Sequence, residues 1–193
     1  MDIIFVRHGV PDFSLADERC MTQLEKDYAP LDRAYLSELH QKFTNAVFDD
    51  AQAIICSPYT RALQTAEILN RRHGFELFVE HDLREWRADT AGGYISLAER
   101  DRRWHEYRKL LKLRLPMSDE RYEHVTALKE RTMAVLERYR QYDKVIVVSH
   151  FNVFEALQGY QEQGLACGDS KIFSSVIDFQ SYRVKSMSNR YWS

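Results

Sequence analysis

The stretch that decides the fold stands near the start of the chain and reads Ile3-Ile4-Phe5-Val6-Arg7-His8-Gly9. Its four apolar residues are rich in β-branched side chains and form a short run, which is typical of a strand buried on both faces. Similar runs occupy 53–56 and 145–148, and weaker ones occupy 77–79 and 172–179. The sequence therefore predicts a sheet of buried strands, and polar residues follow the three strongest of them directly.

Helical patterns lie between these runs. Apolar residues recur at steps of three and four over 36–47 and again over 125–139, and 62–71 consists of good helix formers. Alternation of strands and helices predicts an α/β fold. We expect a three-layer sandwich, in which a mainly parallel sheet carries helices on both faces and a helical insertion lies near the active site.

Length, charge and cysteine usage limit what the chain can be. Its 193 residues suit a single domain, and the net charge of -2 gives no chain-wide attraction for nucleic acid or for anionic membranes. Three cysteines without CxxC spacing suggest neither a disulfide framework nor a zinc site. We find no apolar segment long enough to cross a bilayer and no signal-peptide pattern, so we expect a cytoplasmic protein.

One stretch, 84–118, breaks the alternation and reads as a cap-like insertion within the single domain 1–193. It carries a glycine pair, nine basic against five acidic residues, and therefore a net charge of +4. One interpretation is a solvated helix whose aromatic residues pack on the sheet. The other is a lid whose basic residues, among them Arg100, Arg102 and Arg103, attract a substrate with a second anionic group.

The residues after the strands indicate the chemistry. Arg7 and His8 follow the first strand, Ser57 to Arg61 follows the second, and Ser149-His150 follows the run at 145–148. Because the carboxyl ends of parallel strands line one crevice, two histidines and two arginines should meet there. Arginine presents a fixed fork that matches phosphate oxygens, and imidazole can serve as nucleophile, acid or donor. The expected ligand is a phosphate group.

These residues resemble the histidine phosphatase superfamily, also called the phosphoglycerate mutase-like family. The motifs that carry the resemblance are Arg7-His8-Gly9, Ser57-Pro58-x-x-Arg61-Ala62-x-x-Thr65-Ala66, Leu83-x-Glu85 and Ser149-His150. An RHG tripeptide alone is weak. Four motifs in the family's order, each after the expected strand and together spanning nearly the whole chain, make the resemblance strong.

The resemblance implies a role for each matching residue. His8 would be the nucleophile that takes the phosphoryl group. Arg7, Arg61 and His150 would hold the phosphate oxygens, and His150 would also be a catalytic residue. Glu85 would protonate the leaving oxygen and then help water attack the phosphohistidine. Such a clamp of fixed positive charge needs neither metal nor other cofactor.

Three further positions follow from the same resemblance. Ser14 occupies the place of a phosphate-contacting asparagine, while Gly9 and Ser57 would support the site from behind. The chain also departs from the family pattern: Val10-Pro11 replaces an acidic-Ser pair, and Phe151 replaces a glycine. Because these positions shape the side of the leaving group, the substrates of well-known members do not transfer.

The expected function is metal-independent hydrolysis of a phosphomonoester that is a small anionic molecule. Two alternatives stay open, a phosphomutase of the same fold and a non-catalytic module that binds a phosphorylated ligand. We expect a small-molecule phosphate ester as partner, neither nucleic acid nor membrane, and we allow for a homodimer. A cysteine phosphatase is excluded, because only four residues separate Cys56 from Arg61 where that loop needs five.

Overall fold

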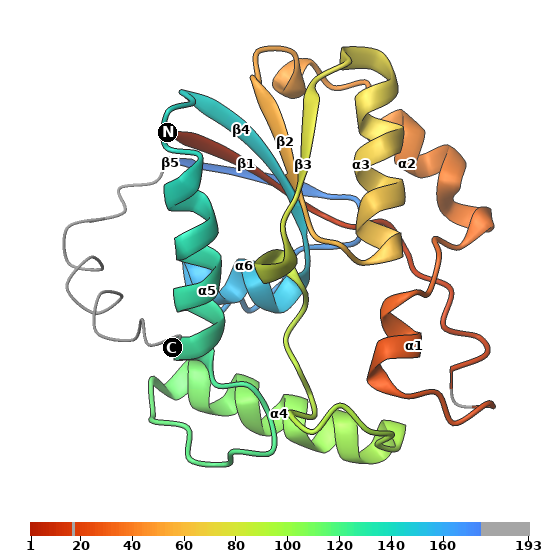
Figure 1. Cartoon of the computed structure of the whole chain (residues 1–193), viewed down its shortest axis with the longest axis vertical. Coiled ribbons are helices and arrows are strands. Elements are labelled where there is room, and N and C mark those ends of the chain that lie inside the picture. The colour runs from red at the N-terminus through yellow and green to blue at the C-terminus, as the bar shows by residue number, and fades with distance from the viewer. Residues whose placement is uncertain (17, 175–193) are drawn as a thin grey trace, which may run out of the picture.

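A five-stranded mixed sheet forms the centre of the computed structural model, which describes residues 1–16 and 18–174 (Figure 1). The strand order is β3-β2-β4-β1-β5. β1 pairs in parallel with β4, β4 with β2 and β2 with β3, whereas β5 runs antiparallel to β1. The strands are β1 (Asp2–Arg7), β2 (Ala53–Cys56), β3 (Glu76–Val79), β4 (Lys144–Ser149) and β5 (Ser170–Ser174).

Helices cover both faces of this sheet. The α-helices are α1 (Gln23–Asp27), α2 (Leu36–Lys42), α3 (Thr60–His73), α4 (Leu97–Leu113), α5 (Val125–Arg138) and α6 (Phe151–Gln158), and the short 3-10 turns are η1 (Arg33–Tyr35), η2 (Ala46–Phe48) and η3 (His81–Leu83). Figure 1 shows α2 and α3 on one side of the sheet and α5 and α6 on the other. The predicted α/β sandwich with a mainly parallel sheet is confirmed.

Alternation along the strands divides the core in two. Ile3 and Phe5 belong to the cluster that packs on α5 and α6, whereas Ile4 and Val6 belong to the cluster that packs on α2 and α3. All four side chains are fully buried. Because successive side chains of a strand point to opposite faces, an unbroken apolar run is what a sheet covered on both sides requires.

The strand predictions are confirmed, with one boundary to report. The run at 172–179 begins within β5, and residues 175–179 lie outside the described part of the chain. A continuous helix over 36–47 is wrong, because α2 ends at Lys42 and a separate 3-10 turn follows. Asn45 caps that turn by accepting a hydrogen bond from the Val47 N–H, and this local bond competes with continued helix.

Two helices, α1 and α6, are not predicted from the sequence. α6 has six buried residues among its eight, so it lacks the polar face that makes a helix recognisable by periodicity. α1 is only five residues long, although Thr22 and Glu25 form a capping box at its start.

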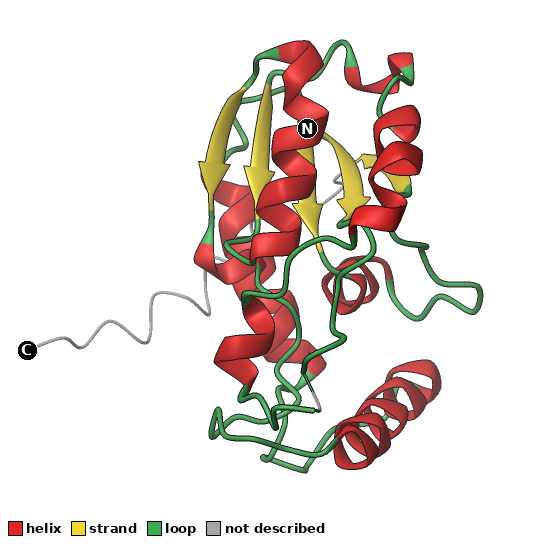
Figure 2. Ribbon diagram, turned by 90° about the vertical axis from the view of Figure 1, so that its right-hand side faces the viewer, coloured by secondary structure: helices red, strands yellow, loops and turns green. Residues whose placement is uncertain are grey.

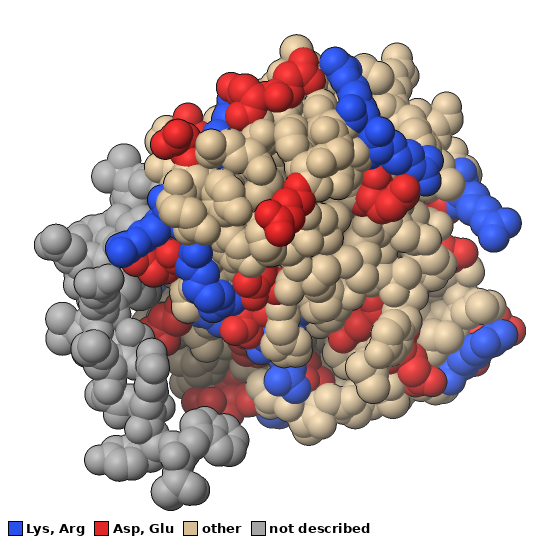
Figure 3. Space-filling model, turned by 45° about the horizontal axis from the view of Figure 1, so that its top comes forward, with Lys and Arg blue, Asp and Glu red and all other residues tan. Residues whose placement is uncertain are grey.

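The insertion places α4 beyond the carboxyl ends of the parallel strands, toward which the arrowheads point in Figure 2. Most of its basic residues are ion-paired. Arg102 contacts Glu99 at 2.8 Å, and Arg103 contacts Glu99 at 2.8 Å and Asp89 at 3.0 Å. On the face shown in Figure 3, basic and acidic side chains are likewise interspersed. Among the described residues, no helix combines the length and apolarity that a membrane span needs.

One buried ion pair joins α4 to α6. Arg108 donates to Glu155 from Nε at 3.1 Å and from Nη2 at 2.8 Å, and the Glu155 side chain is fully buried. The guanidinium also lies over the rings of Trp104, Phe151 and Tyr160. Removing the arginine would leave a buried carboxylate that still accepts a hydrogen bond from the Gln161 N–H, at 2.9 Å on Oε1.

We therefore expect Arg108→Met to lower the free energy of unfolding by about 3 kcal/mol, because an uncompensated buried charge is costly. Urea unfolding of the purified variant measures the change. Lys112→Met, which removes an exposed pair with a 3.9 Å separation on the same helix, should cost under about 1 kcal/mol. Adding Glu155→Leu to Arg108→Met should recover much of the loss. Equal effects of the two single variants would contradict a structural role for this ion pair.

Candidate active site

The ends of β1, β2 and β4 bring three distant segments together. Arg7 pairs in register with Ser149, and the His8 N–H donates to the Ser149 carbonyl at 3.0 Å. The Ser57 N–H donates to the Val148 carbonyl at 3.0 Å. Each predicted site segment therefore leaves the sheet at the same edge, as parallel pairing requires.

His8 lies at the floor of the site and is 5% exposed. Its Nδ1 lies 2.7 Å from the Gly9 carbonyl, and because a carbonyl only accepts, Nδ1 carries the proton. Nε2 is then the unprotonated nitrogen, and it accepts a hydrogen bond from the Arg61 Nε at 3.2 Å. Burial, Arg61 and Arg7 hold the pKa of His8 well below its usual value. A neutral imidazole with a fixed tautomer is what a nucleophile needs.

Arg61 places a positive charge beside that nitrogen. It follows β2 on the first turn of α3 and is 5% exposed. Besides His8, its guanidinium approaches Nδ1 of His150 at 3.5 Å and lies 4.9 Å from the ring centre of Tyr59. Burial lowers the pKa of Arg61 from its usual value, which still leaves it charged. This arrangement offers fixed guanidinium donors to an anion at the His8 Nε2.

The ring centre of His150 lies 5.0 Å from that of His8. His150 is fully buried, and its Nε2 lies 2.7 Å from the Ser57 hydroxyl. Burial, followed by Arg61 and His8, lowers the pKa of His150 well below its usual value. Ser57 thus contacts His150 directly, and its supporting role in the site stays a prediction.

Arg7 supplies the second guanidinium. Its Nη1 donates to the Leu165 carbonyl at 2.6 Å, and its Cζ lies 5.2 Å from the ring centre of Phe151. Its Nε is buried and has no hydrogen-bond partner among the described residues. An unpaired buried donor is costly, so an anion in the pocket would satisfy it.

Glu85 approaches the site from the loop after η3. Its Oε1 accepts from the Trp86 N–H at 2.7 Å. Burial raises the pKa of Glu85 above its usual value, an effect that the Trp86 N–H, the two site arginines and a side-chain hydrogen bond from Asn152 partly offset. Asn152 is oriented in turn by Trp104, whose indole N–H donates to its Oδ1 at 3.0 Å. A carboxyl group with a raised pKa can hold a proton for delivery.

These side chains line a cavity of about 320 Å³. Its lining residues come from the strand ends, from the loop around Glu85, from α1 and from α4: Arg7, His8, Pro11, Phe13, Gln23, Lys26, Asp27, Arg61, Glu85, Trp86, Ala88, Arg100, Asp101, Trp104, Phe151 and Asn152. His150 is not among them, and its side chain is fully buried. Of the three insertion arginines singled out in the sequence, Arg100 reaches the cavity, and it does so paired with Asp101 at 2.9 Å.

The remaining predicted residues lie in different places. Gly9 donates its N–H to the Thr65 hydroxyl at 2.9 Å, and a Cβ there would lie 2.8 Å from the Leu39 Cδ2, so the close approach favours glycine. Ser14 is exposed, outside the cavity lining, and its N–H donates to the Asp12 carboxylate at 3.0 Å. Its phosphate-binding role stays a prediction without support from this placement.

Sequence reasoning missed several lining residues. Asn152 stands two residues after His150 and could have been found from that spacing alone. Gln23 and Asp27 could not, because the capping box marks α1 as a helix but does not say what the helix faces. Within 1–16 and 18–174, no three His, Cys, Asp or Glu side chains gather in a metal-binding group.

Comparison with known proteins places this geometry in a wider context. A family model described as histidine phosphatase superfamily (branch 1) matches residues 3–166. A search among curated sequences finds no match. The structure is similar to that of a mycobacterial glucosyl-3-phosphoglycerate phosphatase solved with VO3, with a TM-score of 0.69 and 16% identity over 90% of this chain and 92% of that one.

A second similar structure is that of Bacillus stearothermophilus YhfR, with a TM-score of 0.66 and 17% identity over 90% of each chain. At such identities the likeness establishes the fold. The family model, by contrast, spans most of the sequence and covers the strand-end segments that form the site. The chain therefore belongs to the histidine phosphatase superfamily, branch 1.

Proposed function

We propose that the protein hydrolyses a phosphomonoester through a phosphohistidine on His8. The observation that carries the proposal is the state of this one imidazole. Its Nδ1 is tied to the Gly9 carbonyl, and its Nε2 is an unprotonated acceptor 3.2 Å from the Arg61 Nε in the pocket. The phosphatase name of one structural neighbour gives additional support.

In the first step the His8 Nε2 attacks phosphorus and the bond from phosphorus to the leaving oxygen breaks. Glu85, whose pKa is raised by burial, gives its proton to that oxygen, so an alcohol departs. The guanidinium groups of Arg7 and Arg61 offset the charge on the phosphoryl oxygens. Phosphoryl transfer needs this positioning and fixed positive charge more than it needs covalent help.

In the second step water attacks the phosphorus of the phosphohistidine and the P–N bond breaks. The Glu85 carboxylate accepts a proton from that water, which restores the acid for the next turnover. Inorganic phosphate leaves, and His8 is neutral again. The proposed substrate is a small phosphate ester whose leaving group fits the part of the cavity between α1 and α4.

Replacing His8 by Ala should abolish turnover of nitrophenyl phosphate, because no other described histidine lines the cavity. Wild-type enzyme quenched during turnover of a labelled phosphate ester should carry acid-labile label, and His8→Ala should carry none. His40→Ala, which removes an exposed histidine on α2, serves as the matched control and should leave the rate unchanged. Chelators should have little effect on either protein. Undiminished hydrolysis by His8→Ala would refute the proposal.

Glu85→Gln should slow hydrolysis of an alkyl phosphate by about 10²-fold or more while slowing nitrophenyl phosphate far less, since only the poor leaving group needs a proton. Asp82→Asn, three residues earlier and exposed at 41% of its side chain, is the control. Steady-state kcat/KM on both substrates measures the contrast. Equal losses on the two substrates would show that Glu85 is not the acid.

The same variant should change the pH profile in a defined direction. For the wild-type enzyme, rates on the alkyl substrate should fall on the acid side as His8 gains a proton, at a pH below its usual pKa of 6.5. They should fall on the alkaline side as Glu85 loses its proton, at a pH above its usual pKa of 4.5. Glu85→Gln should remove the alkaline limb and keep the acid one. An alkaline limb that persists in Glu85→Gln would contradict this assignment.

A further inference from the structure

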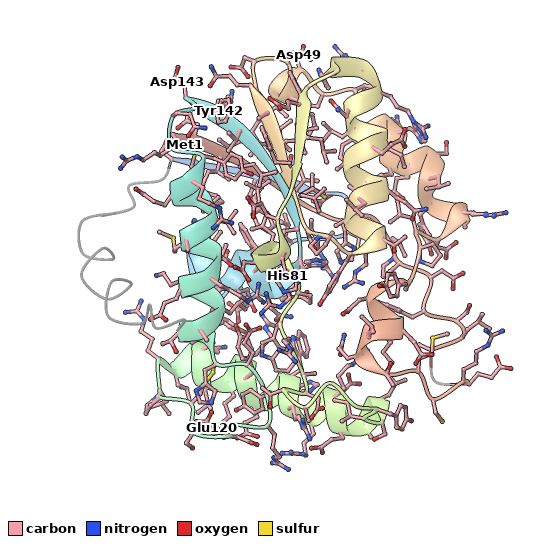
Figure 4. The ribbon with its side chains drawn as sticks, in the orientation of Figure 1. Met1, Asp49, His81, Glu120, Tyr142 and Asp143 are labelled. Atoms are coloured by element: carbon pink, nitrogen blue, oxygen red, sulfur yellow. The ribbon has the colours of Figure 1, made fainter. Side chains whose placement is uncertain are left out.

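The segment that carries Glu85 has no regular secondary structure of its own. It leaves η3, where Figure 4 labels His81, and reaches α4 only at Leu97. The proton donor must nevertheless hold its carboxyl group to within a fraction of an ångström of the leaving oxygen. Something outside the segment has to fix its backbone.

Arg131 on α5 makes that connection. Its Nη1 donates to the carbonyls of Asp82 and Arg84 at 2.5 and 2.8 Å, and its Nη2 donates to the carbonyl of Glu85 at 3.1 Å. One guanidinium thus binds three carbonyls across the turn that leads to the acid. A lysine ammonium could not reproduce this planar, forked pattern.

Glu123 completes the arrangement. Its two carboxylate oxygens accept from the Nε of Arg131 at 2.7 Å and from the Nη2 at 2.9 Å. All five guanidinium N–H donors then have acceptors. The side chains of Arg131 and Glu123 are only 10% and 9% exposed, so these bonds are shielded from water.

Glu123 also binds the part of the loop that follows Glu85. The Arg87 N–H donates to the Glu123 Oε2 at 3.2 Å, and the Trp86 indole N–H donates to the Glu123 carbonyl at 2.7 Å. On the near side, the Ser149 hydroxyl donates to the Leu83 carbonyl at 2.7 Å. Ser149 precedes His150, so the loop is tied to the strand end that carries the phosphate-binding groups.

We propose that Arg131, locked by Glu123, is the positioning residue for the proton donor: it fixes the backbone of 82–85 so that the Glu85 carboxyl group faces the leaving oxygen. This inference rests on the proposed function. Arg131 itself does not line the cavity and acts through Glu85.

Arg131→Met is the first test, with Arg138→Met as the matched control on the same helix. Arg138 also binds a carboxylate, Glu80, but on an exposed surface away from the cavity. Arg131→Met should lower kcat/KM on an alkyl phosphate by about 10- to 100-fold, in keeping with a displacement near 1 Å, while kcat/KM on nitrophenyl phosphate changes less than about threefold. Arg131→Lys should not restore the alkyl phosphate rate.

A double-variant cycle separates positioning from general destabilisation. If Arg131 acts through Glu85, Glu85→Gln with Arg131→Met should be no slower on the alkyl phosphate than Glu85→Gln alone. Losses that multiply, or equal losses on both substrates in Arg131→Met, would overturn the inference. Should Arg131→Met not fold, Arg131→Met with Glu123→Leu removes the buried pair as a unit and carries the same predictions.

An independent readout does not require activity. The Trp86 N–H donates to the Glu85 Oε1 at 2.7 Å, so exchange of this amide with solvent reports where the carboxylate lies. We expect at least tenfold faster exchange in Arg131→Met and none of this change in Arg138→Met. Unchanged exchange would refute the positioning role. Faster exchange together with a Glu85→Gln variant that shows no leaving-group dependence would instead locate the error in the proposed function.

Discussion

The site depends on keeping one imidazole unprotonated beside two guanidinium groups. A histidine can be a nucleophile only while the attacking nitrogen carries no proton, and burial, followed by the charge of Arg61 next to the His8 Nε2, lowers the pKa of His8. The Gly9 carbonyl settles the remaining choice by holding the proton on Nδ1. Much of the surrounding structure keeps the charged Arg61 guanidinium and the neutral His8 imidazole in contact inside the protein.

The sheet achieves this through register. Parallel pairing of β1 with β4 and of β4 with β2 brings the ends of three strands to one edge, and each end is followed directly by a site segment. This part could be predicted from the sequence, because an apolar run and the polar residues after it are local features. Arg131 could not be assigned in the same way. It lies on α5, and what a helical side chain contacts depends on how the helix packs.

The insertion shows why a segment's net charge is a poor guide to its role. The stretch 84–118 has a net charge of +4, yet Arg102 and Arg103 bind carboxylates of the insertion itself and Arg108 binds Glu155. The net charge of a segment does not say which partner each charged side chain binds. What connects α4 to Glu85 is a pair of hydrogen bonds: the Trp104 indole N–H donates to the Asn152 Oδ1, and the Asn152 side chain donates to Glu85.

The choice of the proposed proton donor shows in the same way that the sequence alone does not reveal what a side chain contacts. Four carboxylates lie between positions 80 and 89, namely Glu80, Asp82, Glu85 and Asp89, and their spacing alone cannot select one. In the structure three of them bind guanidinium groups, from Arg138, Arg84 and Arg103 respectively. Glu85 alone among the four lines the cavity, with its pKa raised by burial. The proposed role of Glu85 as the acid therefore rests on its buried position at the cavity, where the Arg131 guanidinium binds its backbone carbonyl and forms no ion pair with its carboxylate.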